Sequence, residues 1–264
     1  MKLQRYRRDD EVSYAMGATI VAELLKANPD CITRVFLRPT EKHGDDLDRI
    51  IADIKQRNIK IIESTKAFNI LGAKDNCLLI AEFDKWRCDM PGDDIYNDDE
   101  YYYHQFFKVV LVNPSDAGNL GTIMRSAAAF GYGEIVIVNP GVDPYDPKVI
   151  RASMGAIFHL WIKTVDDISE VDLAPGSLAF VLDEDAIALD KIERSYNLGG
   201  PPPDLIFGNE ATGLPKDFCK KTGATPVYIP ETDFVDSLNL SIAASIALYT
   251  FRRVPNDFSM HSRH

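Results

Sequence analysis

Apolar residues recur at helical spacing in two stretches of the first third of the chain. This spacing predicts a helix over residues 11–27, where no proline interrupts the pattern, and a second helix over residues 46–56. Short β-branched or apolar runs predict three strands, at residues 32–37, 59–62 and 78–83. Helices that alternate with buried strands are typical of a small α/β sandwich, so we expect one here.

The pattern changes in the second half of the chain, where longer apolar runs appear. Residues 106–112 form an almost unbroken apolar run, which is typical of a strand that is covered on both faces of a sheet. We expect further strands at residues 177–182 and 205–207, and an alanine-rich helix that runs to about residue 253. For this part we therefore predict an α/β fold with a parallel sheet.

An acidic segment separates the two patterns. Residues 89–105 contain six Asp or Glu residues and no Lys or Arg, and they include Pro91 and Gly92. Proline, glycine and like charges together are typical of a linker. We therefore predict three parts, namely a domain over residues 1–90, an acidic linker over residues 91–105 and a domain over residues 106–264.

Composition and charge narrow the class of protein. The chain has 264 residues, of which 45% are hydrophobic, and this excludes a mostly disordered chain. The net charge is −11, but residues 1–88 carry 16 Lys or Arg against 14 Asp or Glu, so we expect a polyanion to meet this segment. No apolar run approaches the roughly 20 residues that span a bilayer. We expect a soluble, cytoplasmic protein with no membrane partner.

The cysteines and histidines do not indicate a metal. The four cysteines, at positions 31, 77, 88 and 219, are widely spaced, whereas a zinc site needs clustered ligands. The five histidines are equally scattered. We expect reduced cysteines, mostly in the core, and no bound metal.

Three polar motifs accompany the expected strands of the second part. In the first, a loop with two glycines leads from residues 106–112 into a helix that carries Asn119 and Arg125. Such a turn lets the backbone approach a ligand, and a tight packing turn has the same composition. Arg125 has apolar neighbours, so it either forms a structural ion pair or faces a cleft and binds a phosphate or polarises a hydroxyl.

The second motif follows residues 205–207 and places Glu210 between Gly208 and Gly213, with Asn209 beside it. A carboxylate at the end of a strand lies where α/β sheets bind their ligands. The other interpretation is an ordinary loop with a helix-capping acid.

The third motif places Ser237 and Asn239 two residues apart at the start of the last helix. Ser237 is a plausible N-cap, which is a purely structural role. Alternatively, both side chains offer polar groups to one pocket. No His–Asp pair accompanies them, so a hydrolase triad is not expected.

Taken together, in this order and spacing, the motifs resemble the three signatures of the SpoU-type (TrmH-like) RNA ribose 2′-O-methyltransferases, of the SPOUT superfamily. The first signature is matched by Asn119, Gly121, Arg125, Phe130 and Gly131. The second is matched by Gly208, Asn209, Glu210, Gly213 and Leu214. The third is matched by Ile229, Pro230, Ser237, Leu238, Asn239 and Ser241. The resemblance covers residues 106–254, and residues 11–84 look like the small ribosomal-protein-like RNA-binding domain of many members.

The resemblance implies a fold, a reaction and an assembly. Members have a deep trefoil knot in the C-terminal domain, whose loops hold S-adenosyl-L-methionine. They form homodimers through the knotted domain, and each active site is bordered by both subunits. For this chain we expect methyl transfer to a ribose 2′-hydroxyl of structured RNA, either tRNA or rRNA.

The resemblance also implies roles for individual residues. Arg125 would activate the ribose 2′-hydroxyl, either as a base or as a stabiliser of the developing alkoxide. The positions that hold Arg125 and the RNA in place would be Asn119, Glu210, Ser237 and Asn239. The positions that bind the cofactor would be Leu182, Gly208, Asn209, Gly213, Ile229 and Leu238.

One position departs from the family pattern, because Ala211 stands where many members have glycine.

A hypothesis from another class is a non-catalytic RNA-binding or ribosome-assembly protein on the same fold. Cofactor binding and the substitution Arg125→Ala distinguish the two, since an adaptor binds RNA equally well without Arg125.

Overall fold

A computed structural model of the chain describes residues 3–40, 44–85, 107–196, 202–232, 234 and 237–252. The predicted acidic linker, residues 91–105, lies outside the described residues. The chain divides into two compact units. The first unit contains Met1–Asp98, Ala117–Arg125 and Val142–Trp161, and the second contains Asp99–Asp116, Ser126–Gly141 and Ile162–His264.

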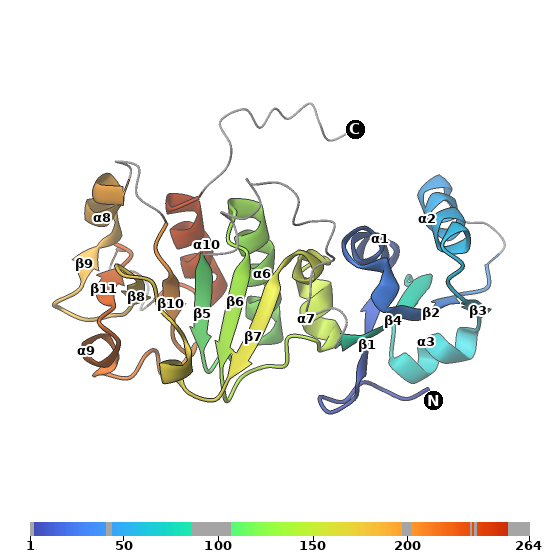
Figure 1. Cartoon of the computed structure of the whole chain (residues 1–264), viewed down its shortest axis with the longest axis horizontal. Helices are drawn as coiled ribbons and strands as arrows, with labels where there is room; N and C mark the ends of the chain where they lie inside the picture. The colour runs from blue at the N-terminus through green and yellow to red at the C-terminus, as the bar shows by residue number, and fades with distance from the viewer. Residues whose placement is uncertain are drawn as a thin grey trace. The chain divides into compact units, whose positions relative to one another are not determined.

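A four-stranded sheet is the centre of the first unit (Figure 1). In spatial order, its strands are β1 (Val12–Met16), β4 (Leu79–Asp84), β2 (Ile32–Leu37) and β3 (Ile61–Glu63). Strand β4 is antiparallel to β1 and to β2, whereas β3 is parallel to β2. The N-terminal helices are α1 (Ala18–Ala27), α2 (Asp45–Gln56) and α3 (Thr65–Leu71), with the 3-10 turn η1 (Pro29–Cys31).

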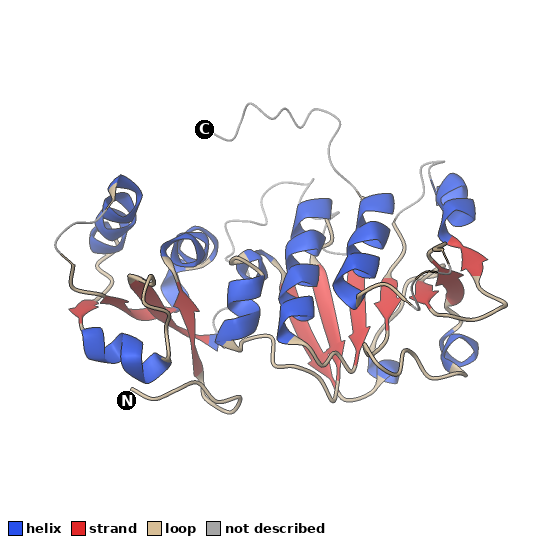
Figure 2. Cartoon of the chain, turned by 180° about the vertical axis from the view of Figure 1, so that it is seen from behind, coloured by secondary structure: helices blue, strands red, loops and turns tan. Residues whose placement is uncertain are grey.

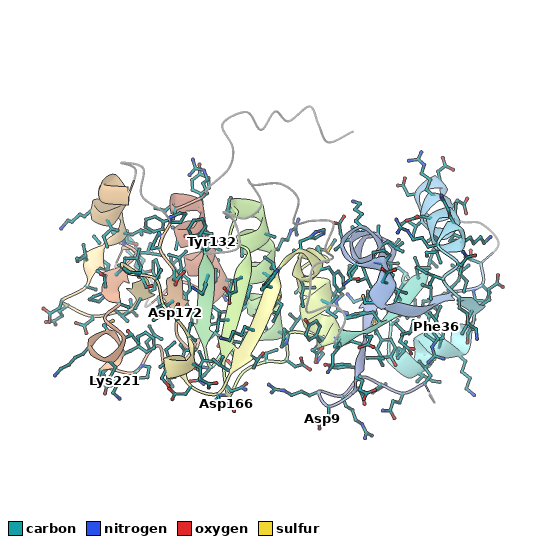
Figure 3. All side chains as sticks on the ribbon, viewed as in Figure 1. Asp9, Phe36, Tyr132, Asp166, Asp172 and Lys221 are labelled. Carbon is teal, nitrogen blue, oxygen red and sulfur yellow. The ribbon has the colours of Figure 1, made fainter. Side chains whose placement is uncertain are left out.

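These helices cover both faces of the sheet. Helices α1 and α2 lie on one face and α3 lies on the other (Figure 1, Figure 2). Phe36 of β2, labelled in Figure 3, packs with Phe68 of α3 in one buried cluster. On α1, Ile20, Val21 and Leu24 are each at most 4% exposed. The expected small α/β sandwich therefore has a core on each side of its sheet.

The structure corrects the prediction at the start of the chain. Residues 12–16 form strand β1, although the spacing predicted a helix over residues 11–27, and α1 begins only at Ala18. A spacing of four residues, such as that from Val12 to Met16, fits two strand periods as well as one helical turn. Gly17 separates the two elements with a φ of 116°, which an L side chain rarely adopts.

The first unit also contains helix α7 (Pro147–Ala152) and the 3-10 turn η3 (Ala156–His159). The Ser13 hydroxyl of β1 donates a hydrogen bond to the Tyr145 carbonyl oxygen at 2.5 Å. The Phe83 ring of β4 meets the Tyr145 and Phe158 rings edge to face. Strands from the start of the chain thus share a buried interface with residues 142–161.

An ion pair lies on the same interface. Nε2 of His159 lies 3.0 Å from Oε2 of Glu23, and Nζ of Lys26 lies 2.9 Å from Oε1 of Glu23. Burial by itself raises the pKa of the Glu23 carboxyl, but hydrogen bonds from Lys26 and His159 outweigh it and lower the pKa below its ordinary value. Glu23 is therefore ionised and held by two basic side chains.

A seven-stranded sheet forms the second unit. Its strands, in spatial order, are β7 (Trp161–Val165), β6 (Glu134–Val138), β5 (Lys108–Val112), β10 (Leu205–Phe207), β8 (Leu178–Phe180), β11 (Thr225–Tyr228) and β9 (Ile187–Ala188). The pairs from β6 to β9 are all parallel. The predicted parallel α/β sheet is therefore confirmed.

Helix α6 (Ala117–Phe130) belongs to the second unit from Ser126 onward, and its earlier residues belong to the first. The second unit also contains helices α8 (Leu189–Tyr196), α9 (Phe218–Thr222) and α10 (Leu240–Thr250) and the 3-10 turn η4 (Ile168–Glu170). Helices α6 and α10 lie side by side on one face of the sheet (Figure 1, Figure 2). The Ser126 and Ser245 hydroxyls form a 2.7 Å hydrogen bond between them. The Phe130 and Tyr249 rings meet edge to face at 5.6 Å between centroids. Tyr132, labelled in Figure 3, is buried.

None of the helices in the described ranges is long and apolar enough to cross a membrane. The described residues contain no group of three His, Cys, Asp or Glu side chains that could hold a metal ion. Cys31 is buried and disulfide-bonded, so the prediction of four reduced cysteines is wrong for this residue, while Cys77 and Cys219 are free thiols.

Candidate active site at the carboxyl edge of the parallel sheet

Three of the sequence-predicted residues follow neighbouring parallel strands. Leu182 comes two residues after the end of β8, Gly208 directly after β10 and Ile229 directly after β11. Strand β8 pairs in parallel with both β10 and β11, so all three residues lie at the same edge of the sheet. In open α/β sheets this carboxyl edge is where ligands bind.

The loop after β10 is closed upon itself. Asn209 and Gly213 form an isolated antiparallel bridge, in which the Gly213 N–H donates to the Asn209 carbonyl oxygen at 2.9 Å. A Cβ atom at Gly208 would lie 2.2 Å from the Gly213 carbonyl carbon and 2.4 Å from the Leu214 nitrogen. Gly213 has a φ of +64° and faces open space. The turn therefore requires glycine at position 208, where a Cβ atom would clash with the backbone. It favours glycine at position 213, where φ is positive.

The Asn209 side chain joins this loop to the end of β5. Its Nδ2 donates to the Asn113 carbonyl oxygen at 2.8 Å, directly after β5. Its Oδ1 accepts from the backbone N–H groups of Ala211 at 2.9 Å and Thr212 at 3.1 Å. One amide thus stabilises the turn and fixes it against the neighbouring strand.

The Glu210 carboxylate contacts the residues that precede α6. Oε2 accepts from the Ser115 N–H at 3.0 Å and from the Ser115 hydroxyl at 2.7 Å, and Oε1 accepts from the Asp116 N–H at 3.1 Å. Helix α6 begins at the next residue, Ala117. A carboxylate at a helix N-terminus satisfies N–H groups and interacts favourably with the helix dipole. These contacts agree with the helix-capping interpretation of Glu210 and bring the first two motifs together.

Asn119 and Arg125 lie on different faces of α6. Asn119, in the first turn, is 9% exposed and therefore buried, whereas Arg125 is exposed. The apolar neighbours Met124 and Ala127 are fully buried, but they do not bury the arginine. Arg125 has no ion pair with any residue that the structure describes. Its guanidinium is thus available to a ligand, and the structural ion pair allowed by the sequence is not formed with a described residue.

Asn239 is the residue that caps helix α10. Its Oδ1 accepts from the Ser241 N–H at 2.9 Å and from the Ser241 hydroxyl at 2.6 Å. Ser237 is exposed and lies outside the helix, so its predicted role as N-cap is wrong. Both residue types are favourable N-caps, and the helix begins two residues later than the sequence indicated. Leu238, between them, is half-buried.

The sequence motifs do not indicate two features of the structure. Asn113 and Ser115, the partners of the second motif, contribute mainly backbone groups, which leave no residue pattern to recognise. Helix α10 also exposes Ile242, Ile246 and Tyr249, at 51%, 37% and 55%. These three residues occupy one face at spacings of four and three residues. We call them the α10 stripe.

Comparisons with known proteins agree with this geometry. The model of the SpoU rRNA Methylase family matches residues 107–249, and a model described as RNA 2′-O ribose methyltransferase substrate binding matches residues 14–68. The first match covers more than half of the chain. The chain belongs to the SpoU rRNA methylase family.

Named relatives and solved structures extend the comparison. Mouse mitochondrial rRNA methyltransferase 3 is 31% identical over 57% of this chain and 47% of its own length. A 23S rRNA uridine 2′-O-methyltransferase of Streptomyces viridochromogenes is 30% identical over 61% of this chain and 56% of its own length. The chain thus spans about half the length of these curated relatives. The structure of an AdoMet-bound rRNA methyltransferase from Sinorhizobium meliloti superposes with a TM-score of 0.69 and 27% sequence identity. The match covers 92% of this chain and 87% of the Sinorhizobium chain.

Proposed function

We propose that this protein transfers a methyl group from S-adenosyl-L-methionine to a ribose 2′-hydroxyl of structured RNA, either tRNA or rRNA. The observation that carries the proposal is the set of Asn209 and Glu210 contacts, which assemble the first two family motifs at the carboxyl edge of the sheet. The names of the Streptomyces and Sinorhizobium relatives support the reaction and the cofactor.

The residues at this edge fit the proposed cofactor. Leu182 is 75% exposed and Ile229 is half-buried, so they offer apolar surface that an adenine ring would cover. The turn from Gly208 to Gly213 offers backbone groups beside them, with Asn209 fixing its shape. Leu238 is the third apolar position of the proposed site. When bound, S-adenosyl-L-methionine supplies a methyl group on a positively charged sulfur.

Arg125 is the proposed catalytic residue. Its exposed guanidinium has five donors, which suit a ribose oxygen that becomes negative and an adjacent phosphate. Glu210 would act on it through α6, whose N-terminus it holds, and Asn119, Ser237 and Asn239 would hold the surrounding backbone and the RNA.

We further propose a homodimer through the knotted domain, the last of three parts of the chain. The parts are a ribosomal-protein-like RNA-binding domain (residues 1–90), a linker (91–105) and a knotted domain (106–264). The α10 stripe supports a dimer, because three exposed apolar side chains on one helix face are stabilised when a second copy covers them. Arg125 is also exposed on the neighbouring helix α6, as a site bordered by both subunits requires. We place the enzyme in the cytoplasm.

The test is methyl transfer to tRNA and rRNA transcripts that lack natural modifications, followed by nucleoside mass spectrometry. Wild type should form a 2′-O-methylnucleoside, and Arg125→Ala should lower the rate by about 100-fold or more, as for loss of one preorganised donor. Arg125→Lys keeps the charge without the planar fork and should recover only part of the rate. A base-methylated nucleoside would contradict the ribose assignment. RNA binding without cofactor binding would favour the non-catalytic assembly protein.

A further inference from the structure

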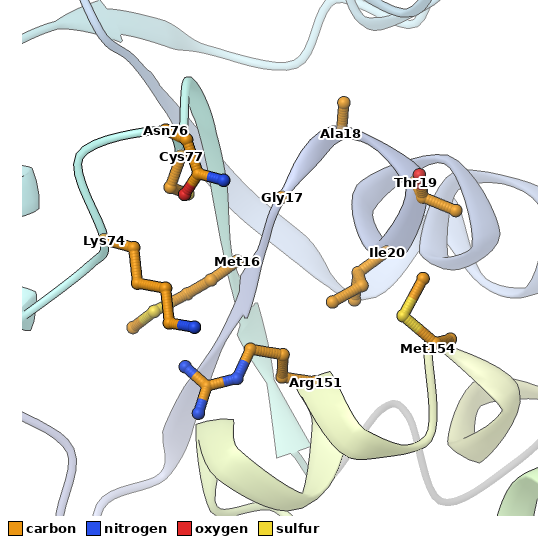
Figure 4. Close-up of a pocket in the computed structure, with 10 residues that line it drawn as sticks. All are labelled: Met16, Gly17, Ala18, Thr19, Ile20, Lys74, Asn76, Cys77, Arg151 and Met154. Atoms are coloured by element: carbon orange, nitrogen blue, oxygen red, sulfur yellow. The ribbon is translucent and has the colours of Figure 1, made fainter.

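A surface pocket of about 280 Å³ lies in the first unit, and none of the residues that line it belongs to the three motifs (Figure 4). Three segments line it, namely the turn from β1 into α1, the loop at residues 74–77 and helix α7 with the residue after it. The volume is slightly below that of pockets that enclose whole small molecules, about 300–1,000 Å³. It suits one charged group of a larger ligand.

Two basic side chains enter this pocket from different segments. Lys74 comes from the loop and Arg151 from α7, and Figure 4 shows their nitrogen atoms directed toward the same space. Neither side chain forms an ion pair with a residue that the structure describes. Asp75, the nearest acid in the sequence, does not line the pocket. Two like charges that converge without a carboxylate repel each other, and a bound anion reverses that repulsion.

The backbone at the opposite wall adds donors. Gly17 precedes α1, and no side chain caps this ten-residue helix. The first N–H that bonds to a helix carbonyl is that of Val21, so the N–H groups of Ala18 and Thr19 have no acceptor within the helix. Both residues line the pocket. The helix dipole at this end has the same sign as the two side chains.

Basic side chains continue beyond the pocket along the same loop. Nε of Arg38 donates to the Cys77 carbonyl oxygen at 2.9 Å, and the Arg38 guanidinium covers the Phe68 ring at 4.5 Å. The Arg5 guanidinium lies beside Gly72, where an added Cβ would meet it at 4.0 Å. Several positive charges on one stretch of surface suit a polyanion better than an isolated phosphate.

We propose that this pocket binds a phosphate of the RNA backbone, held by Lys74, Arg151 and the first N–H groups of α1. RNA is favoured over other phosphates because the substrate-binding family model matches residues 14–68, which include the turn that forms one wall. This proposal rests on the proposed function for its ligand. It adds a phosphate contact made by α7, which lies outside that matched range.

The first test measures RNA affinity against salt concentration for the full-length chain, with unmodified rRNA and tRNA transcripts. The double variant Lys74→Gln/Arg151→Gln should bind about tenfold more weakly at 0.15 M salt, and the slope of log K against log salt should become about one unit shallower. Lys55→Gln removes an exposed charge of α2 that does not line the pocket, and it should change neither quantity. Arg151→Lys on the wild-type background keeps the charge and should preserve the slope.

The second test locates the phosphate without RNA. Inorganic pyrophosphate should cause saturable shifts in the backbone amide resonances of Ala18 and Thr19, in the wild type and in Lys55→Gln. The double variant should lose these shifts while its thermal unfolding and its affinity for S-adenosylhomocysteine stay unchanged. Absence of the shifts in the wild type would overturn the proposal. Shifts accompanied by an unchanged RNA salt slope would also overturn it, because the pocket would then take small phosphates only.

The two tests separate this inference from the proposed function. If no RNA is methylated but the salt slope and the amide shifts change as expected, the phosphate site stands and the reaction is wrong. If methylation occurs and the double variant has the wild-type salt slope, the reaction stands and the phosphate site is wrong.

Discussion

The contacts of Glu210 predict how much of the site depends on one carboxylate. Glu210→Ala removes three hydrogen bonds, two of them from backbone N–H groups at the start of α6. Bonds to a charged group contribute about 1.5–3 kcal/mol each when protected, and far less when solvent competes, as it does here. At about 0.5–1 kcal/mol each, the free energy of unfolding should fall by about 2 kcal/mol. Glu210→Gln keeps one acceptor oxygen and should lose about 1 kcal/mol.

Thermal unfolding followed by circular dichroism measures the difference. About 2 kcal/mol corresponds to a Tm lower by roughly 4–8 °C in a chain of this size. Glu63→Ala, at an exposed glutamate of β3, should lower Tm by no more than about 1 °C. If Glu210→Ala unfolds at the same temperature as Glu63→Ala, the carboxylate does not hold α6. If Glu210→Gln is nearly as stable as wild type but has lost methyl transfer completely, the charge takes a direct part in the chemistry.

Three further perturbations test the loop, the dimer and the ion pair at Glu23. Gly208→Ala should lower the free energy of unfolding by about 3 kcal/mol or more in urea titrations, because its Cβ meets backbone at 2.2 Å. Gly213→Ala should cost only about 1–2 kcal/mol, the penalty of a left-handed conformation, and equal losses would contradict the contact. Ile246→Glu should convert a sedimenting dimer into a monomer, whereas Ile187→Glu on β9 should leave the dimer intact. The lowered pKa of Glu23 means that its contribution to stability is present at neutral pH and is lost as pH falls below its ordinary value of 4.5. Glu23→Gln should therefore be less stable at pH 7, by under about 1 kcal/mol, and the difference should shrink as pH falls below 4.5; a difference that stays constant as the pH is lowered would exclude this cause.

The fold could be predicted from the sequence where local patterns have one interpretation. Strand β2 and helix α2 lie within one residue of the ranges that the spacing predicts. Strand β1 could not be predicted, because Val12 and Met16 fit both periods and only pairing with β4 decides between them. The strand order β5, β10, β8, β11 was equally inaccessible, since it depends on pairing between residues far apart in the chain.

For the candidate site, too, some features could be predicted from the sequence and others could not. Side-chain types and their order identify the family, and they locate Gly208, Asn209 and Glu210 directly after a strand. Their partners could not be predicted, because Glu210 binds the main chain of Ser115, 95 residues away, and any residue type supplies an N–H group. The contacts also change the interpretation of the motifs. The side chains of Asn209, Glu210 and Asn239 accept hydrogen bonds from backbone N–H groups of loops and helix ends, which supports a role in positioning the backbone. Arg125 is a charged motif side chain that is exposed and has no ion pair within the described residues, and for this reason we propose it as the residue that carries the chemistry of methyl transfer.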